Sequence, residues 1–262
     1  MKVGITLPQF RDESDSAIGA ARRAEALGID AVFCFDHLWP MGQPGRPALS
    51  SGPLLGALAA STSTIAVGTL VARIGLLPDE VLVAELSSLA VLSGGRVIAG
   101  MGTGDHLSRA ENEAYGIPFE AASERRVRLA SVAASVRDEG IPVWIGGGLP
   151  KTVELARTLS VAVNLWEGDV LRVAELATTG VEVTWGGPVG DTVEDATRRL
   201  GDVAGAGATW AVCAWPDSLD VVAEAAEHVR NLDDRPGGTA AAVGGDGATG
   251  TDGVSRPSGP RQ

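Results

Sequence analysis

Three glycines at alternate positions could form one wall of a ligand site. Gly100, Gly102 and Gly104 follow a short apolar run, and Asp105 and His106 come directly after them. Glycine lets the backbone approach a flat or anionic ligand closely, because no Cβ fills the space beside it. The stretch therefore predicts a buried strand that ends in a ligand-binding rim, with a plain loop as the alternative.

The spacing of these glycines argues against a dinucleotide-binding fold. Such folds carry the pattern G-x-G-x-x-G at a helix start, with an acidic residue about 20 positions later. Residues 100–104 read G-M-G-T-G, and no helix pattern opens directly from them. A Rossmann fold is therefore poorly supported.

Composition and charge narrow the classes of protein. The chain has 262 residues, 45% of them hydrophobic, and a formal net charge of −12, which suits one large or two small domains. Lys2 and Lys151 are the only lysines and no basic stripe is present, so we expect neither nucleic acid nor a membrane as a partner. No run has the length and hydrophobicity of a membrane span, and the first residues read as a strand rather than a signal peptide. We expect a cytoplasmic protein.

The positions of the cysteines, histidines and lysines argue against metal sites and against a Schiff-base lysine. Cys34 and Cys213 are the only cysteines and lie in apolar strand-like runs, where we expect buried thiols without a disulfide or a zinc site. His37, His106 and His228 form no H-x-H pair, and neither lysine stands at a strand end. Metal hydrolase and aldolase chemistry are therefore disfavoured.

Strand-like and helix-like segments alternate along the chain, as they do in parallel βα units. The strands are expected at Val3–Leu7, Ala31–Phe35, Ile65–Val71, from Val97 into the glycines, and at Pro142–Ile145, Val161–Leu165, Val181–Trp185 and Thr209–Ala214. Helices are expected from Ser14 or Ser16 to Leu27, at about Pro53–Ala60, Asp79–Leu92, up to Gly140, and at Lys151–Leu159, Val170–Thr179, Thr192–Ala204 and Leu219–Val229. In the helix that ends near Gly140, we expect Glu124, Arg125, Arg126 and Arg128 on the solvent side.

Eight strands, each followed by a helix, predict an α/β fold, a single (β/α)8 TIM barrel with short connections. We expect the barrel to comprise residues 1–232. Residues 233–262 are rich in glycine and alanine, and such a stretch buries too little apolar area to offset its ordering entropy, so we expect a disordered tail. In this fold the chemistry lies at the carboxyl ends of the strands. The side chains expected at that mouth are Asp36, His37, Thr69, Gly102, Asp105, Gly146–Gly148 and Asn164.

Five sequence blocks together resemble the luciferase-like flavin monooxygenase family. This superfamily includes bacterial luciferase, alkanesulfonate monooxygenases and dehydrogenases and reductases that use the deazaflavin F420. The blocks are D-A-V-F-C-F-D-H-L (30–38), S-T-S-T-I-A-V-G-T-L-V (61–71), L-S-G-G-R-V-I-A-G-M-G-T-G-D (92–105), I-P-V-W-I-G-G-G-L-P-K-T (141–152) and V-N-L-W (163–166). The resemblance implies an oxidoreductase with a luciferase-like barrel.

The resemblance also implies F420 or FMN as a cofactor that lies across the barrel mouth. A non-prolyl cis peptide, common at the end of strand three in this family, would fall at Leu70-Val71. The phosphate would lie at Gly146, Gly147 and Gly148 and the following Lys151 and Thr152, where N–H groups, a helix start and a lysine converge; a simple chain turn is the alternative. The residues implied around the ring are Asp36, Thr69, Leu70, Val71, Gly102, Thr103, Gly104 and Asn164.

His37 matches the position of a catalytic base in F420-dependent members of this family, and Asp105 matches that of its acidic partner. Transfer of hydride from a carbon must be accompanied by removal of an O–H proton, which requires a base near neutral pKa. The alternative is a histidine that only orders the loop at Trp39. Asp36 lies on the opposite face of its strand, so a structural hydrogen bond to the next loop is expected for it.

Two functional hypotheses follow. The first is hydride transfer or monooxygenation of a small organic substrate, with F420 favoured over FMN because the D-H and G-T-G-D motifs resemble that branch. The second is a non-catalytic or degenerate flavin-binding barrel, because the connections that cover the substrate in longer relatives are short here. A homodimer is a candidate assembly.

Overall fold

The predicted (β/α)8 barrel is confirmed. In the computed structural model, which describes residues 1–10, 16–39, 43–46 and 48–233, parallel strands close into a barrel in chain order, from β1 to β8 and back to β1. The strands are β1 (Lys2–Thr6), β2 (Ala31–Cys34), β3 (Ala66–Arg73), β4 (Val97–Gly102), β5 (Val143–Gly146), β6 (Ala162–Trp166), β7 (Val183–Gly187) and β8 (Trp210–Cys213).

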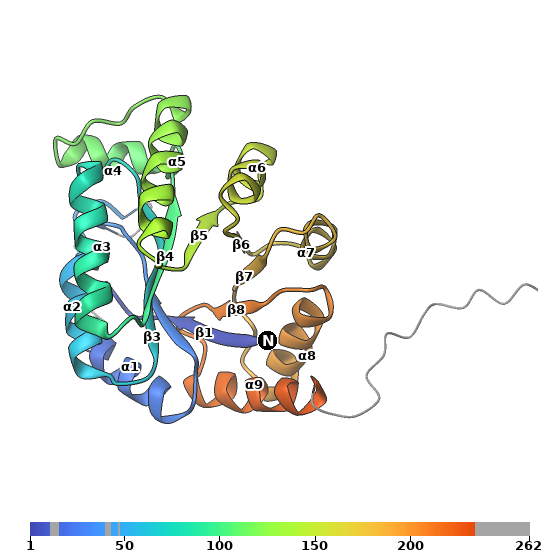
Figure 1. Cartoon of the computed structure of the whole chain (residues 1–262). Helices are drawn as coiled ribbons and strands as arrows, with labels where there is room; N and C mark the ends of the chain where they lie inside the picture. Colours follow the sequence, from blue (N-terminus) through green and yellow to red (C-terminus); the bar gives the residue numbers. More distant parts are fainter. Residues whose placement is uncertain (11–15, 40–42, 47, 234–262) are drawn as a thin grey trace, which may run out of the picture.

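Helices surround this ring of strands (Figure 1). A buried apolar layer between strands and helices makes most of the core. The helices are α1 (Ala17–Ala26), α2 (Ser51–Ser61), α3 (Asp79–Ser93), α4 (Ser108–Ala114), α5 (Ala122–Asp138), α6 (Pro150–Leu159), α7 (Val170–Ala177), α8 (Val193–Gly205) and α9 (Leu219–Asp233). Among the described residues, none of them combines the length and hydrophobicity that crossing a bilayer requires.

The helix α4 is not among the helices expected from the sequence, which predicts a loop after Asp105. It begins where Asp105 Oδ1 accepts hydrogen bonds from the backbone N–H groups of Leu107 (2.9 Å) and Ser108 (3.2 Å). An aspartate that satisfies the free N–H groups of a helix start stabilises that start. The residues of α4 are mostly polar, so no apolar periodicity marks the helix in the sequence.

The predicted solvent exposure of Arg125 is wrong. This residue of α5 is buried, its Nε donates to Thr103 O at 2.7 Å, and its guanidinium lies 4.0 Å from the centre of the Phe119 ring. The start of α5 packs against the loop that follows β4, and the carbonyl groups of that loop replace water around the guanidinium. Arg125 therefore ties α5 to one wall of the barrel mouth.

Large aromatic rings fill the barrel interior because glycines stand opposite them. A Cβ at Gly4 or at Gly68 would lie 2.9 Å from the ring of Phe33. That distance is too short for carbon atoms without a shift of the backbone or the ring. Phe33 in turn packs on Trp144, with 5.2 Å between ring centres.

The expectation for strand three is confirmed: the register between β3 and β4 shifts between Thr69 and Ala72, and the Leu70-Val71 peptide is cis. Cys34 and Cys213 are buried free thiols, as predicted, and burial raises the pKa of both. The predicted tail boundary stays untested, because α9 runs to Asp233 and residues 234–262 lie outside the described residues.

Candidate functional site

A cavity of about 540 Å³ opens at the carboxyl ends of the strands. Its walls come from the ends of β2 to β6 and from the loops that follow them. The lining residues are Phe35, His37, Leu70, Val71, Arg73, Gly104, Asp105, Ser108, Gly146, Gly147, Gly148, Asn164, Leu165, Trp166, Gly168 and Arg172. This volume lies in the usual range of small-molecule sites.

Most of the sequence-predicted site residues meet in this cavity. His37, Asp105 and Asn164 contribute polar groups, while Leu70, Val71, Gly104 and Gly146–Gly148 contribute its walls. Gly102, Thr103, Lys151 and Thr152 lie close by in the chain but do not line it.

Asp36 and Thr69 face away from this cavity, contrary to the expectation that they share the mouth. Both line a separate groove between the barrel and the helices α2 and α3. Asp36 accepts from Ser51 Oγ at 2.8 Å and from the Arg73 N–H at 2.9 Å, which is the structural hydrogen bond that strand alternation predicts. Burial outweighs these bonds and raises the pKa of Asp36.

The side chain that contacts His37 is Glu111, a residue of α4 that the sequence reasoning did not single out. His37 Nδ1 lies 2.9 Å from Glu111 Oε2, and the carboxylate is only 1% exposed. Glu111 Oε1 also accepts from the backbone N–H of Leu38. A carboxylate only accepts hydrogen bonds, so this contact places the hydrogen of the imidazole on Nδ1 and leaves Nε2 as an acceptor.

A buried cation completes this pair. Arg73, at the end of β3, has its Nη2 at 3.0 Å from Glu111 Oε2, and its Nε donates to Asp36 O at 2.8 Å. Burial alone would raise the pKa of Glu111, but the bonds from His37 and Leu38 and the charge of Arg73 outweigh it and lower that pKa. Glu111 is therefore ionised at neutral pH.

Asp105 lines the same cavity as His37 but has a different set of contacts. Its Oδ1 accepts from the first N–H groups of α4, and its side chain is solvent-exposed. The G-T-G-D motif thus holds the helix that carries Glu111 as well as placing a carboxylate at the mouth.

A second part of the cavity has the features of an anion site. Gly146–Gly148 lead into the first turn of α6, where Thr152 N and Val153 N donate to Leu149 O and the positive end of the helix dipole favours an anion. Arg172 lines the cavity here, and its Nη2 donates to Gly148 O at 3.0 Å. The predicted cation Lys151 is exposed in the first turn of α6 and does not line the cavity.

The floor of the cavity suits a flat ring. A Cβ at Gly102 or Gly146 would lie 2.7 or 2.9 Å from the side chain of Val71, so this valine fills the space that both glycines leave. Arg73 also lines the cavity, and its buried Nη2 lies 3.0 Å from Glu111 Oε2. The residues present therefore fit a planar heterocycle that carries acceptor atoms and an anionic tail.

Comparison with known proteins relates the first part of the chain to one sequence family. Residues 1–128 match the sequence model of the family described as "Luciferase-like monooxygenase". An F420-dependent glucose-6-phosphate dehydrogenase of Beutenbergia cavernae is 35% identical over 124 residues, which cover 47% of this chain and 35% of the relative.

This family match covers just under half of the chain, 128 of its 262 residues. Solved structures agree with this luciferase-like fold over a longer stretch. An F420-dependent secondary alcohol dehydrogenase, in complex with an F420-acetone adduct, matches with a TM-score of 0.74 and 15% identity, covering 87% of this chain and 99% of that one. The monooxygenase RslO1 from Streptomyces bottropensis matches with a TM-score of 0.73 and 14% identity, covering 89% and 100%. The curated sequence relative, by contrast, is matched over only about a third of its length.

Proposed function

We propose that this luciferase-like barrel is an oxidoreductase that binds F420 or FMN at the carboxyl-end mouth and oxidises or reduces a small organic substrate. The observation that carries the proposal is the histidine with a buried ionised carboxylate behind it, Glu111 at 2.9 Å from His37, at the edge of a cavity with a flat apolar floor. Such a pair is equipped to move a proton beside a bound ring.

The bound cofactor would supply the hydride acceptor. As hydride leaves the substrate carbon, the hydroxyl proton of the substrate passes to His37 Nε2, so that an alcohol becomes a carbonyl compound. Glu111 keeps the Nδ1 hydrogen in place and stabilises the imidazolium that forms. Asp105, exposed at the same mouth, is placed to return a proton in the opposite direction.

The residues that would hold the cofactor divide into two groups. Val71, Leu70 and Asn164 would contact the ring, and Gly146–Gly148 with the first turn of α6 would bind the phosphate. Arg172 is the cation that lines this end, and Lys151 is close enough in the chain to add to its field. The sequence likeness to an F420-dependent dehydrogenase favours F420 over FMN.

The cofactor can be identified directly. The protein is to be purified from a host that makes F420, and its absorption spectrum and the mass of any released cofactor are to be measured. We expect the purified protein to contain F420, or to contain FMN if it is an FMN-dependent enzyme. Protein that has neither, and that binds neither when each is added at about 100 μM, would leave the proposal without support. Cofactor that binds without turnover would favour the non-catalytic barrel.

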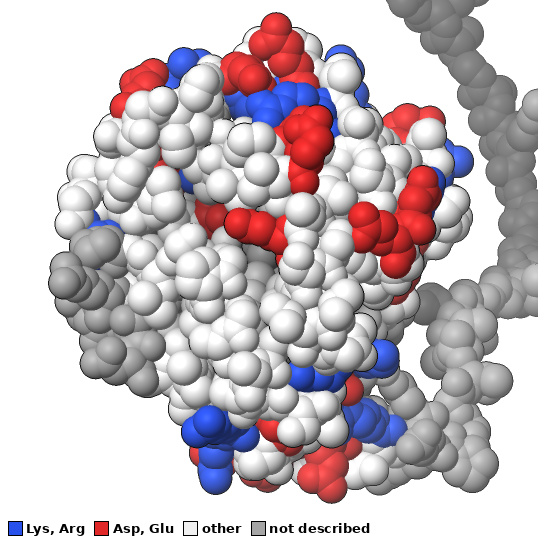
Figure 2. Space-filling view, turned by 60° about the vertical axis from the view of Figure 1, so that its left-hand side comes forward, with Lys and Arg blue, Asp and Glu red and all other residues white. Residues whose placement is uncertain are grey.

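We also propose a homodimer through the groove between α2 and α3. The groove has a volume of about 600 Å³ and is lined largely by apolar side chains such as Leu55, and Val81 (43%) and Leu92 (74%) on α3 are exposed. The helices α2 and α3 are on the left-hand side of Figure 1, and Figure 2 shows the molecule with that side turned forward. Residues other than Lys, Arg, Asp and Glu fill most of the middle of the face in Figure 2. Light scattering is expected to give twice the chain mass, and Val81→Asp to give the monomer; a wild-type monomer would refute the dimer.

A further inference from the structure

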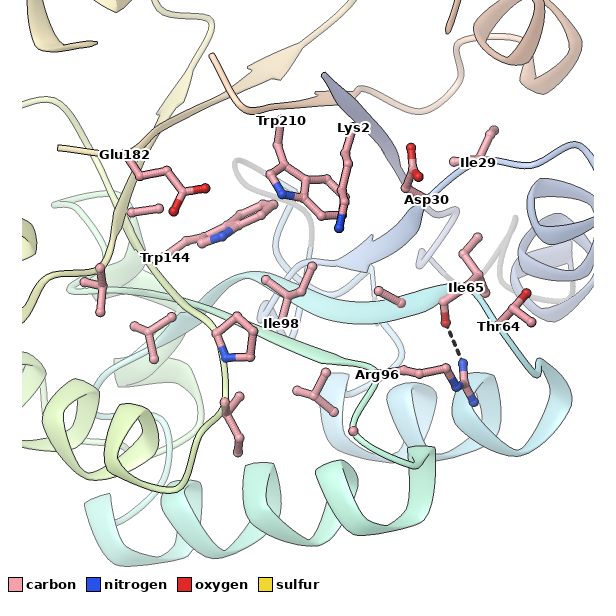
Figure 3. A pocket seen from close by; sticks show the side chains of 18 of the residues that line it. Lys2, Ile29, Asp30, Thr64, Ile65, Arg96, Ile98, Trp144, Glu182 and Trp210 are labelled. Carbon is pink, nitrogen blue, oxygen red and sulfur yellow. Dashed lines mark hydrogen bonds between the residues drawn. The ribbon is translucent and has the colours of Figure 1, made fainter. Parts of the chain in front are cut away.

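A second cavity, of about 690 Å³, opens at the opposite end of the barrel, where the strands begin. Figure 3 shows it from close by, with Trp144 and Trp210 across its floor and Lys2 beside Trp210. The proposed function does not use this cavity. Its residues come from the starts of the strands and the loops before them, far along each strand from His37.

The cavity exists because small residues stand next to large ones at the strand starts. Ala66 of β3 and Ala162 of β6 line it, and an alanine side chain is a single methyl group. Trp144 and Trp210 meet edge to face, with 5.4 Å between their ring centres. The two indoles make a rigid aromatic floor and leave the space below it open.

Most charged side chains around the opening already have partners in the protein. Glu25 accepts from the backbone N–H groups of residues 63–65, Asp30 from Val3 N, and Glu182 from Thr209 Oγ1. Arg96 donates to backbone oxygens, among them those of Ser93 and Ala59. These contacts hold loops together and leave little of these side chains for a ligand.

Lys2 is different. Its Nζ lies 5.1 Å from the centre of the Trp210 ring, and the ammonium has no ion pair or hydrogen bond with any residue that the structure describes. The indole N–H groups of Trp144 and Trp210 also lack an acceptor within the described part of the chain. Buried or half-buried indole N–H groups usually have an acceptor. Two indole N–H groups and the ammonium of the exposed Lys2 therefore border one aromatic cavity, with no acceptor from the described residues.

We propose that this amino-end cavity binds a small planar aromatic carboxylate. The ring would stack on the indoles of Trp144 and Trp210, and the carboxylate would lie on the Lys2 side, away from Glu182, which stands on the far side of the two indoles in Figure 3. An ammonium over an aromatic ring and N–H donors at its edge recognise an anionic group on a flat ring.

The test uses 2-naphthoate as the probe and its neutral amide as the comparison, with calorimetric titration of the full chain. We expect saturable binding of naphthoate, weaker binding of the amide, and a loss of about tenfold in naphthoate affinity in Lys2→Gln, which removes one charge-assisted contact. The amide should bind Lys2→Gln and the wild type alike. Arg157→Gln, which removes an equal charge from the exposed face of α6, is the matched control and should leave both affinities unchanged.

Two outcomes would overturn the proposal. One is no saturable binding of naphthoate by the wild type up to about 5 mM, a concentration at which even weak specific sites fill. The other is equal binding of naphthoate by the wild type, Lys2→Gln and Trp210→Leu, which would place the ligand elsewhere. Circular dichroism of each variant establishes that the fold is intact before its affinity is compared.

Discussion

The two mouths of the barrel are built differently although both are open and both have cavities of several hundred cubic ångströms. At the carboxyl end, charged groups pair with one another: the partly exposed His37 contacts the buried Glu111, which contacts the buried Arg73. At the amino end, aromatic rings make the floor and Lys2 has no carboxylate partner among the described residues. His37, held by the ionised Glu111, can act as an acid or a base at the carboxyl end. The ammonium of Lys2 over the Trp210 indole can only recognise a ligand at the amino end.

The largest expected effect concerns the base. If the carboxyl-end mouth alone does chemistry, His37→Asn should retain cofactor binding and lose turnover by roughly two to four orders of magnitude. Lys2→Gln, at the other mouth, should keep near-wild-type turnover. Steady-state rates with saturating cofactor measure both. Near-full activity in His37→Asn would mean that the D-H motif is structural, and it would contradict the assignment of the chemistry to the His37–Glu111 pair.

The next effect concerns the buried carboxylate. Glu111→Gln leaves the charge of Arg73 buried without its ionic partner, so we expect a loss of about 3 kcal/mol in the free energy of unfolding. Glu113→Gln on the same helix is the matched control, because Glu113 is 62% exposed in its ion pair with Arg109, and it should cost less than about 0.5 kcal/mol. Urea unfolding measures both. Equal stability of the two variants would mean that the Glu111 contacts contribute no more than a surface ion pair.

A smaller effect separates the two candidate cations at the phosphate end. Arg172→Gln should weaken cofactor binding about tenfold through the loss of one charge-assisted contact, and Lys151→Gln should weaken it less, because Lys151 does not line the cavity. Reversing that charge in Lys151→Glu adds repulsion at the helix start and should cost more than Lys151→Gln. Fluorescence titration gives the dissociation constants. A larger loss in Lys151→Gln than in Arg172→Gln would move the phosphate toward α6.

At the amino end, a pH-dependent stability is expected from Glu25. Hydrogen bonds, the first from the Thr64 N–H, lower the pKa of Glu25 to about 2 from a usual 4.5. A lowered pKa stabilises the fold above the unfolded value, so this contribution is present above pH 4.5 and disappears as the pH falls toward 2. Glu25→Gln should therefore be less stable than the wild type at pH 7 and should approach it near pH 2 to 3. A stability gap that is the same at all pH values would contradict the assigned cause.

The smallest expected effect is on removal of residues 234–262. The sequence there has no periodic apolar pattern, so the shortened chain should unfold within about 1 kcal/mol of the full chain and should bind the cofactor and naphthoate with unchanged affinity. A shift in either affinity would show that these residues contribute to one of the two mouths.

The fold could be predicted from the sequence because short apolar runs, which form the buried strands, alternate regularly with helix-length segments along the chain. The helix α4 could not, since Ser108–Ala114 is nearly all polar and is held by Asp105 and by contacts of its buried Glu111. Charged residues are expected on the surface, and nothing local marks Glu111 or Arg125 as buried.

Only the part of the candidate site that stands at strand ends could be predicted from the sequence. His37 and Gly146–Gly148 stand at strand ends and are visible in the sequence. The pairing of His37 with Glu111 joins residues 74 positions apart, and only the closed barrel brings them together. Lys151 was predicted at the phosphate because it follows the glycines at a helix start, but it is exposed and does not line the cavity. Arg172 was not singled out, because it lies 24 positions after Gly148, to whose carbonyl it donates.

The most direct test of the account is the location of the cofactor, read from the indole N–H signals of the tryptophans in a nitrogen-15 NMR spectrum. Trp166 lines the carboxyl-end cavity and is 40% exposed, while Trp144 and Trp210 line the amino-end cavity. Signals are assigned with Trp→Phe variants, and F420 or FMN is then added. The account predicts that the Trp166 signal shifts on saturation and that those of Trp144 and Trp210 stay in place. Shifts at Trp144 and Trp210 with none at Trp166 would contradict it.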